Sequence, residues 1–277
     1  MSDRDGATTA GWLRDEILPP LLILAVALIL WEAAVKSLDI PPWLLPAPTD
    51  IVDRFFKTKT LWYHTGFTVL EALAGFLISA VLGVSLSAGI VHSRFLERGV
   101  FPYVIVSNAI PIIAVIPLLT IWFGFGLAPK IMICAIISFF PIVTNTTRGL
   151  KSADRRIIEF MRSINAKRSE ILFKVQLPSA LPFISASFKI AASVALVGAV
   201  VAEFYSSDLG LGYLIITSAT QLRTDLLFVA IAVLAALGVS SFTLFGYLER
   251  KVTRGERTRR CNESGAHSRR TDRSATR

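Results

Sequence analysis

Four charged residues interrupt long apolar stretches of the sequence and are the first candidates for chemistry: Glu32, Glu71, Lys189 and Glu203. Charged side chains in such stretches either belong to an ion relay or act as anchors whose charged ends reach water. The glutamates lie near the ends of their stretches, and a lysine extends its ammonium group to the interface along an apolar stem. We therefore expect anchoring side chains, with an ion relay as the alternative.

Other patterns that carry chemistry are absent from the sequence. It contains no G-x-x-x-x-G-K-[ST] phosphate-binding loop, no H-E-x-x-H zinc motif and no cysteine cluster, and its histidines are far apart: His64, His92 and His267. We expect no catalytic residue, no metal, no cofactor and no ATP site of this type on the chain. If the protein transports a solute, the energy comes from the membrane potential, an ion gradient or a separate ATPase.

A few uncharged polar residues also lie within the apolar stretches, among them Ser79, Asn108, Thr144 and Asn145. Such side chains either line a path for a polar solute or hydrogen-bond neighbouring helices to one another. The sequence is compatible with both roles. These four residues are therefore candidates for a translocation path.

The elements that would hold these residues are helices that cross a membrane. The 277-residue chain is 53% hydrophobic and 18% charged, with a mean hydropathy of +0.59, which is far from the composition of soluble proteins. A helix needs about 20 apolar residues to cross a bilayer. Six runs approach or exceed that length: 18–35, 66–91, 101–123, 130–147, 182–202 and 226–248. The sequence predicts an all-α membrane protein with six transmembrane helices.

The uneven placement of Lys and Arg predicts the orientation of these helices. Eight lie in the connection between the fourth and fifth expected helices and ten in the tail from Arg250 to Arg277, whereas the loop after the fifth has only Arg223. Cytoplasmic loops are enriched in these residues. We expect this connection and both termini in the cytoplasm. The stretch between the first two helices opposes that orientation, because it contains Lys36, Arg54, Lys57 and Lys59.

The expected division of the chain follows from these elements. Residues 1–16 form a cytoplasmic segment, and 17–63 hold the first helix and an extracytoplasmic linker whose prolines, in IPPWLLPAPTD, forbid a regular helix. Residues 64–248 form a five-helix core, with its longest cytoplasmic loop at 149–181. The basic tail, 249–277, has almost no apolar residues and is expected to be disordered and solvated. Binding of the tail to anionic lipid or nucleic acid is the alternative.

The loop 149–181 carries an amphipathic pattern. Asp154 is a suitable N-cap, and the apolar residues after it recur at helical spacing on one face: Ile157, Ile158, Phe160, Met161, Ile164, Ile171, Leu172 and Val175. Asn165 readily adopts a left-handed backbone, so we expect a turn there between two short helices. Leu177-Pro178 is expected to end the second helix, because the residue before proline is disfavoured in helical dihedrals.

An apolar face on a basic helix fits two locations. It could lie in the bilayer interface with its charges in water, or it could dock on another protein. Periodicity and charge alone do not separate these two locations.

The spacing within this loop resembles a known motif. In the membrane subunits of binding-protein-dependent ABC importers, the motif is Glu-Ala-Ala, three residues, Gly, nine residues and Ile-x-Leu-Pro. Here Glu159-Phe160-Met161, Asn165 and Val175-Gln176-Leu177-Pro178 stand at the same spacing. Residues 110–126, 139–150 and 200–215 are similar to segments of permeases of the nitrate, sulfonate, taurine and bicarbonate importer group. The resemblance covers residues 40–250.

The resemblance implies the type I ABC importer permease architecture, with a coupling-helix loop between the fourth and fifth helices. It suggests an ATPase-coupling role for this set: Glu159, Ile164, Asn165, Ala166, Ile171, Leu172, Leu177 and Pro178. It further implies two copies of a cytoplasmic ATPase, an extracytoplasmic solute-binding protein and a second permease copy, which we expect to form a homodimer.

The expected location is the bacterial inner membrane, and the expected solute is nitrate, a sulfonate, taurine, bicarbonate or a related small organic compound. An ion-coupled carrier and a non-transporting membrane scaffold are the alternatives.

Overall fold

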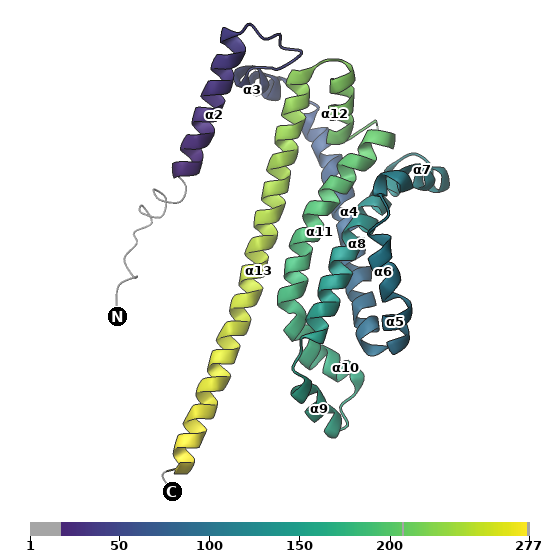
Figure 1. Cartoon of the computed structure of the whole chain (residues 1–277), viewed down its shortest axis with the longest axis vertical. Helices are drawn as coiled ribbons and strands as arrows, with labels where there is room; N and C mark the ends of the chain where they lie inside the picture. Colours follow the sequence, from purple (N-terminus) through teal and green to yellow (C-terminus); the bar gives the residue numbers. More distant parts are fainter. Residues whose placement is uncertain (1–17, 207, 276–277) are drawn as a thin grey trace. The chain divides into compact units, whose positions relative to one another are not determined.

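The computed structural model describes the backbone of residues 18–206 and 208–275, and the side chains of residues 18–205 and 208–251 (Figure 1). Every regular element in these residues is helical, which confirms the all-α fold class. The chain divides into two compact units. Among the described residues, the linker unit comprises 18–62 together with Leu214–Ala232, and the core unit comprises those of Tyr63–Tyr213 together with 233–275.

Five helical stretches in the described part of the chain are long and apolar enough to cross a membrane. They are α2 (Leu18–Ser37), α4 (Leu61–His92), α8 (Leu127–Lys151), the run formed by α10 (Arg168–Ile171), η2 (Leu172–Gln176) and α11 (Leu177–Ser206), and the first part of α13 (Thr224–Ala275). These correspond to the first, second, fourth, fifth and sixth expected helices. The backbone of α13 stays helical through 249–275, where the sequence predicts disorder, and the side chains beyond Lys251 lie outside the described residues.

The third expected helix, 101–123, is broken, so the prediction of one continuous helix there was wrong. α5 (Arg94–Gly99) and α6 (Phe101–Ser107) form one arm, α7 (Ile112–Phe123) forms the other, and the two arms are bent by 102°. Pro111 lies between them in extended backbone, with φ −60° and ψ 116°. A proline has no N–H to continue the hydrogen-bond ladder and pushes the preceding residue out of helical dihedrals. The segment is therefore a broken span or a re-entrant turn.

The centre of the core unit is the contact between α8 and α11, which lie side by side (Figure 1). Small side chains allow this close approach: Ala191, Ala195 and Ala199 on α11 are at most 1% exposed. Gly75 brings α4 equally close to α8, because a β-carbon at residue 75 would lie 2.3 Å from Cβ of Cys134. Small residues are typical of helix contacts in membranes, where tight packing rather than exclusion of water holds helices together.

In the linker unit, residues 214–232 pack with the segment that contains α2 and α3 (Pro48–Lys57). The carboxylate of Glu32 accepts hydrogen bonds from the backbone N–H and the hydroxyl of Thr49, at 3.1 and 2.9 Å. Arg54 on α3 pairs with Asp225 at the start of α13, at 3.3 Å. The end of α12 (Leu211–Thr220) and the start of α13 thus belong to the same unit as the first span. The sequence instead places the first span in a segment separate from these helices.

Within the loop 149–181, the predictions for Asp154 and Asn165 are confirmed. The Oδ1 atom of Asp154 accepts a hydrogen bond from the N–H of Arg156 at 2.8 Å and caps α9 (Arg155–Ser163). Asn165 has a φ of +54°, the left-handed turn expected of it. α10 then starts with the N–H of Lys167 donating to Oε2 of Glu170 at 2.9 Å.

The expected helix end at Leu177-Pro178 was wrong. Leu177 has helical dihedrals, φ −64° and ψ −45°, and its N–H donates to the carbonyl of Leu172, five residues back. The chain therefore runs without interruption from α10 through the π-helix η2 into α11. Pro178 explains the π-turn, since in a regular α-helix its ring would clash with the carbonyl of Lys174 four residues earlier.

Candidate functional site

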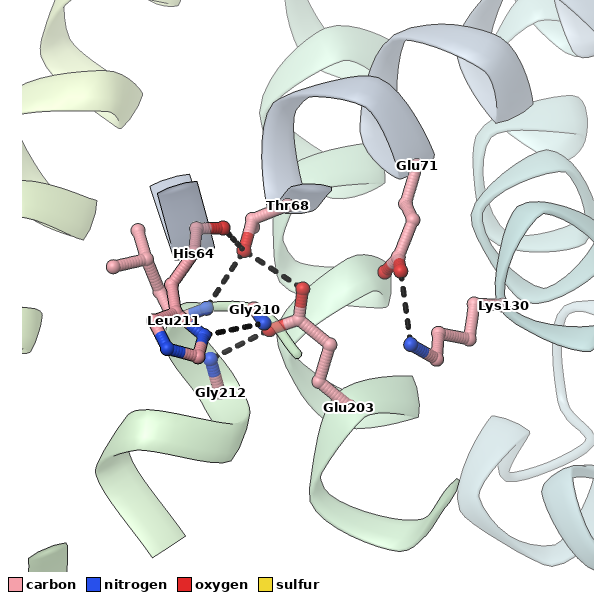
Figure 2. Close-up of polar contacts among 8 residues, drawn as sticks. All are labelled: His64, Thr68, Glu71, Lys130, Glu203, Gly210, Leu211 and Gly212. Carbon is pink, nitrogen blue, oxygen red and sulfur yellow. Dashed lines mark hydrogen bonds and ion pairs between the residues drawn. The ribbon is translucent and has the colours of Figure 1, made fainter. Parts of the chain in front are cut away.

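A cluster of buried polar side chains lies in the core unit, where α4, α8 and α11 meet the turn before α12 (Figure 2). α4 contributes His64, Thr68 and Glu71, α8 contributes Lys130 and α11 contributes Glu203, and each of these residues is at most 9% exposed. We call these five residues the carboxylate cluster.

The carboxylate of Glu203 holds the start of α12 against α4. Its Oε1 atom accepts a hydrogen bond from the hydroxyl of Thr68 at 2.7 Å, and its Oε2 atom accepts one from the N–H of Gly212 (Figure 2). The Thr68 hydroxyl in turn accepts the N–H of Leu211 at 2.8 Å. A carboxylate is favourable at this place because the first N–H groups of a helix have no partner within the helix and carry partial positive charge.

Gly210 makes this arrangement possible. It has a φ of +110°, a region that side-chain-bearing L-residues avoid. Its N–H donates to Nδ1 of His64 at 3.1 Å. A β-carbon at residue 210 would lie only 2.1 Å from Oε1 of Glu203, so no larger residue fits without displacing that carboxylate.

Glu71 and Lys130 form an ion pair at 3.0 Å beside Glu203, and their side chains are 0% and 4% exposed. Oε1 of Glu71 accepts the bond from the ammonium group, whereas Oε2 of Glu71 is buried without a hydrogen-bond partner. Breaking such a buried pair by removing one partner costs several kcal/mol, because an uncompensated charge stays behind.

The expectation that Glu71 and Glu203 are interfacial anchors was wrong. α4 begins at Leu61, so Glu71 lies well inside the helix, and Glu203 is covered by the turn before α12. Sequence reasoning missed their partners His64, Thr68 and Lys130. One feature of the sequence could have indicated a buried ion pair: Lys130 is a charged residue at the edge of another expected helix.

The two remaining charged candidates lie at the surface. Glu32, whose side chain is 21% exposed, pairs with the exposed Lys36. Lys189 extends toward Glu249 at 3.7 Å and lies 3.9 Å from the ring centroid of Phe242 on α13. A lysine over an aromatic face gains a modest cation–π attraction, and both contacts fit the anchoring role.

A cavity of about 480 Å³ opens beside the Glu71–Lys130 pair. Its lining is partly aromatic and partly charged: Phe67, Phe125, Gly126, Leu127, Lys130, Tyr205, Asp208 and Leu209. That volume is within the range of pockets that take small molecules, roughly 300–1,000 Å³. Among the described residues, no group of three or more His, Cys, Asp and Glu could hold a metal ion.

Several large apolar side chains on α9 and at its C-cap, Ile164, are exposed, whereas Ile158 and Met161 are half-buried. Ile157, Phe160 and Ile164 are 48%, 63% and 58% exposed. Glu159 lies on the same helix and pairs with Arg155 at 3.0 Å, where both side chains are largely exposed. α9 thus presents an unpartnered apolar surface flanked by charge.

The other residues expected to couple to the ATPase lie in the turn after α9 or in the helical run that follows it. Ile171 is 6% exposed, and Leu172 packs against Leu150, Ala180 and Ile184 of α8 and α11. The N–H of Ala166 donates to the carbonyl of Met161 at 3.0 Å and closes the Asn165 turn. Leu177 and Pro178 are the first residues of α11. The structure therefore attaches the α9 surface to the two central helices of the core unit.

Three of the four candidate path residues hydrogen-bond to their own helices. The hydroxyls of Ser79 and Thr144 donate to carbonyls of their own helices, at 2.9 Å each. The side-chain amide of Asn145 does the same to Pro141 at 2.9 Å. Asn108 is exposed at the break between α6 and α7. In this chain three of them therefore satisfy local backbone groups.

Residues 75–254 match the family described as binding-protein-dependent transport system inner membrane component, and the chain belongs to this family. It is 37% identical over 236 residues to the riboflavin transport system permease protein RibX of Chloroflexus aurantiacus, covering 84% of this chain and 88% of RibX. It is 32% identical over 236 residues to the formylaminopyrimidine transport permease protein ThiX of Halalkalibacterium halodurans, covering 84% of this chain and 94% of ThiX.

Solved structures share the fold. A chain of the methionine ABC transporter MetNI in an inward-facing conformation aligns with a TM-score of 0.58 at 22% identity, covering 69% of this chain and 94% of that one. Family and fold together define the protein as the multi-pass, membrane-spanning permease subunit of an ABC importer, which works with an ATPase and a solute-binding protein.

Proposed function

We propose that the protein imports a small solute as one half of a homodimeric permease driven by two ATPase subunits, and that α9 is the surface on which an ATPase docks. The observation that carries this proposal is the exposed apolar face of Ile157, Phe160 and Ile164. Large apolar side chains gathered on an exposed helix mark a place where a partner binds. The match of Glu159 through Pro178 to the family motif favours a protein partner over the bilayer interface.

The attachment of α9 accounts for how ATP-driven movement reaches the spans. The Asn165 turn joins α9 to α10; Ile171 at the end of α10 is buried, and Leu172 at the start of η2 packs against buried residues of α8 and α11. Closure of the ATPases would displace α9 and, through these two side chains, both central helices. The result is the tilt that switches which side of the membrane the path faces.

Truncating the α9 face tests the docking role. Phe160→Ala and Ile164→Ala are each expected to weaken retention of the ATPase about tenfold, since an interface anchor contributes more than ~1 kcal/mol and 1.4 kcal/mol is a factor of ten. Co-purification of the importer from membranes measures this. The matched control is Phe56→Ala on α3, which truncates a 77% exposed Phe elsewhere and should leave retention unchanged. Full retention in both α9 variants would contradict the docking role.

The orientation of the chain belongs to the same proposal. The connection 149–181 and the tail 249–277 are rich in Lys and Arg, so we place both in the cytoplasm together with the N-terminus. The carboxylate cluster and the 480 Å³ cavity then lie toward the outer side, where the solute-binding protein arrives. Single cysteines introduced at the exposed residues 156 and 208 of a cysteine-free variant test this. Labelling of residue 156 by an impermeant reagent added outside intact cells would contradict the orientation.

For the solute we propose a small organic compound or oxyanion of the nitrate, sulfonate, taurine and bicarbonate kind. RibX and ThiX are named for larger ring compounds, and the 480 Å³ cavity has room for a small organic molecule. Mass spectrometry of what the cognate binding protein captures identifies the class. Capture of a peptide or a polysaccharide would contradict it.

The energy source separates this function from the alternatives. Uptake into vesicles is expected to stop when ATP is depleted and to survive an uncoupler. An ion-coupled carrier would show the reverse, and a scaffold would show no flux under either condition.

A further inference from the structure

The charges of the carboxylate cluster do not balance. Glu71 and Glu203 are 0% and 1% exposed, and Lys130, at 3% exposed, is the one cation that faces them among the described residues. With both carboxyls ionised, the cluster would hold one uncompensated negative charge away from water. An ion left unpaired in such surroundings costs several kcal/mol and is normally neutralised by a proton.

Other titratable groups around the pair add no positive charge. His64 on α4 accepts the N–H of Gly210 at Nδ1, so its ring is neutral, because both nitrogens of a charged imidazole are donors. α8 contributes the buried thiol of Cys134, and α12 contributes the phenol of Tyr213, which stacks on His64. Asp208, before α12, is exposed at the cavity and is itself acidic.

The hydrogen bonds point to the same deficit. Both oxygens of Glu203 already accept a bond, one from Thr68 and one from Gly212. Oε1 of Glu71 accepts the bond from Lys130, but its Oε2 atom is buried without a donor. The carboxyl groups of Glu71 and Glu203 lie beside each other in the cluster (Figure 2). Two facing carboxylates have no hydrogen between them unless one of them is protonated.

We propose that the cluster is a proton-binding site, in which one proton on Oε2 of Glu71 is donated to the carboxylate of Glu203. This proton gives the Oε2 atom of Glu71 a hydrogen-bond partner. It also leaves Glu203 as the single carboxylate whose negative charge balances the positive charge of Lys130. The proton belongs to Glu71 rather than Glu203, because both Glu203 oxygens face N–H or O–H donors.

Infrared spectroscopy of the intact importer at neutral pH, in a maltoside detergent that has no carbonyl group of its own, tests the proposal. A protonated carboxylic acid has a carbonyl stretch that ionised carboxylates lack. The wild-type spectrum is expected to contain this band, and Glu71→Gln is expected to remove it. The matched control is Glu97→Gln, which changes an exposed carboxylate paired with Lys151 and should leave the band in place. A wild-type spectrum without a band sensitive to Glu71→Gln would overturn the proposal.

Thermal unfolding gives a second, independent readout. Glutamine resembles a protonated glutamate, so Glu71→Gln should melt within a few degrees of the wild type. Glu203→Gln should melt clearly lower, because its NH₂ group would face the Thr68 or Gly212 donor. If both carboxylates were ionised, Glu71→Gln would instead raise the melting temperature by removing the surplus charge, and that result would overturn the proposal. The reverse order of the two variants would overturn the assignment of the proton to Glu71.

Discussion

Replacement of Gly210 by alanine is expected to detach the start of α12 from the core unit. The new β-carbon would lie 2.1 Å from Oε1 and 2.6 Å from Oε2 of Glu203. The carboxylate is the end of a side chain and can withdraw, but only by losing its bonds to Thr68 and Gly212. The residue would also have to keep a φ of +110°.

These terms add to a large effect. A residue held in a sparsely populated backbone region costs about 1–3 kcal/mol, and each lost hydrogen bond to a charged group costs about 1.5–3 kcal/mol. With two such bonds at stake, the expected destabilisation is roughly 4–9 kcal/mol. That is comparable with the whole free energy of unfolding of a typical domain, about 5–15 kcal/mol.

The matched control is Gly66→Ala, in α4 near the same cluster. A β-carbon at residue 66 would meet nothing within 4 Å, so this change should be neutral or stabilise the helix by up to about 1 kcal/mol. Loss of folded permease on heating in detergent compares the two variants. Equal melting temperatures for Gly210→Ala and Gly66→Ala would refute the reasoning about the turn.

Three further outcomes are expected. Asn165→Gly should keep transport-linked ATP hydrolysis, because glycine adopts the φ of +54° freely. Asn165→Pro should uncouple ATP hydrolysis from transport, because proline holds φ near about −65°. ATPase assays of both variants in nanodiscs test this difference. Lys130→Met should cost about 3–5 kcal/mol, because it removes the cation that balances the buried carboxylate of the cluster, whereas Lys36→Met, which truncates a side chain that is 65% exposed, should melt like the wild type. A double-mutant cycle on Glu97 and Lys151, a pair whose side chains are 42% and 44% exposed, should give a coupling of at most about 1 kcal/mol.

The predictable part of the fold is the part governed by local rules. Run lengths located the spans, because a helix must satisfy its own backbone in a bilayer. Asp154 as a cap and Asn165 as a left-handed residue were identified for the same kind of reason, since each acts within a few residues of itself. These features needed no knowledge of the tertiary structure.

The part that could not be predicted depends on contacts between residues distant in sequence, or on local sequences that are compatible with more than one backbone conformation. Glu203 and Thr68 are 135 positions apart, and no periodicity links them. Two prolines show the competition between local solutions: Pro111 breaks a span, while Pro178 sits in a helix that continues through a π-turn. A proline predicts that the regular hydrogen-bond ladder of the helix is interrupted. The packing of neighbouring helices then determines whether the helix breaks or continues through a π-turn.

The π-turn at η2 has a consequence for the direction in which the coupling surface faces. One extra residue in a helix rotates everything before it by about 100° relative to everything after it, because an α-helix has 3.6 residues per turn. α9 and α10 precede η2, and α11 follows it. Deleting one residue from Leu172–Gln176 would therefore swing Phe160 and Ile164 a quarter turn or more around the axis of α11, with every one of their side chains intact. The number of residues in η2 therefore sets the direction in which α9 faces around the axis of α11. The chain should tolerate a substitution in η2 better than an insertion or a deletion.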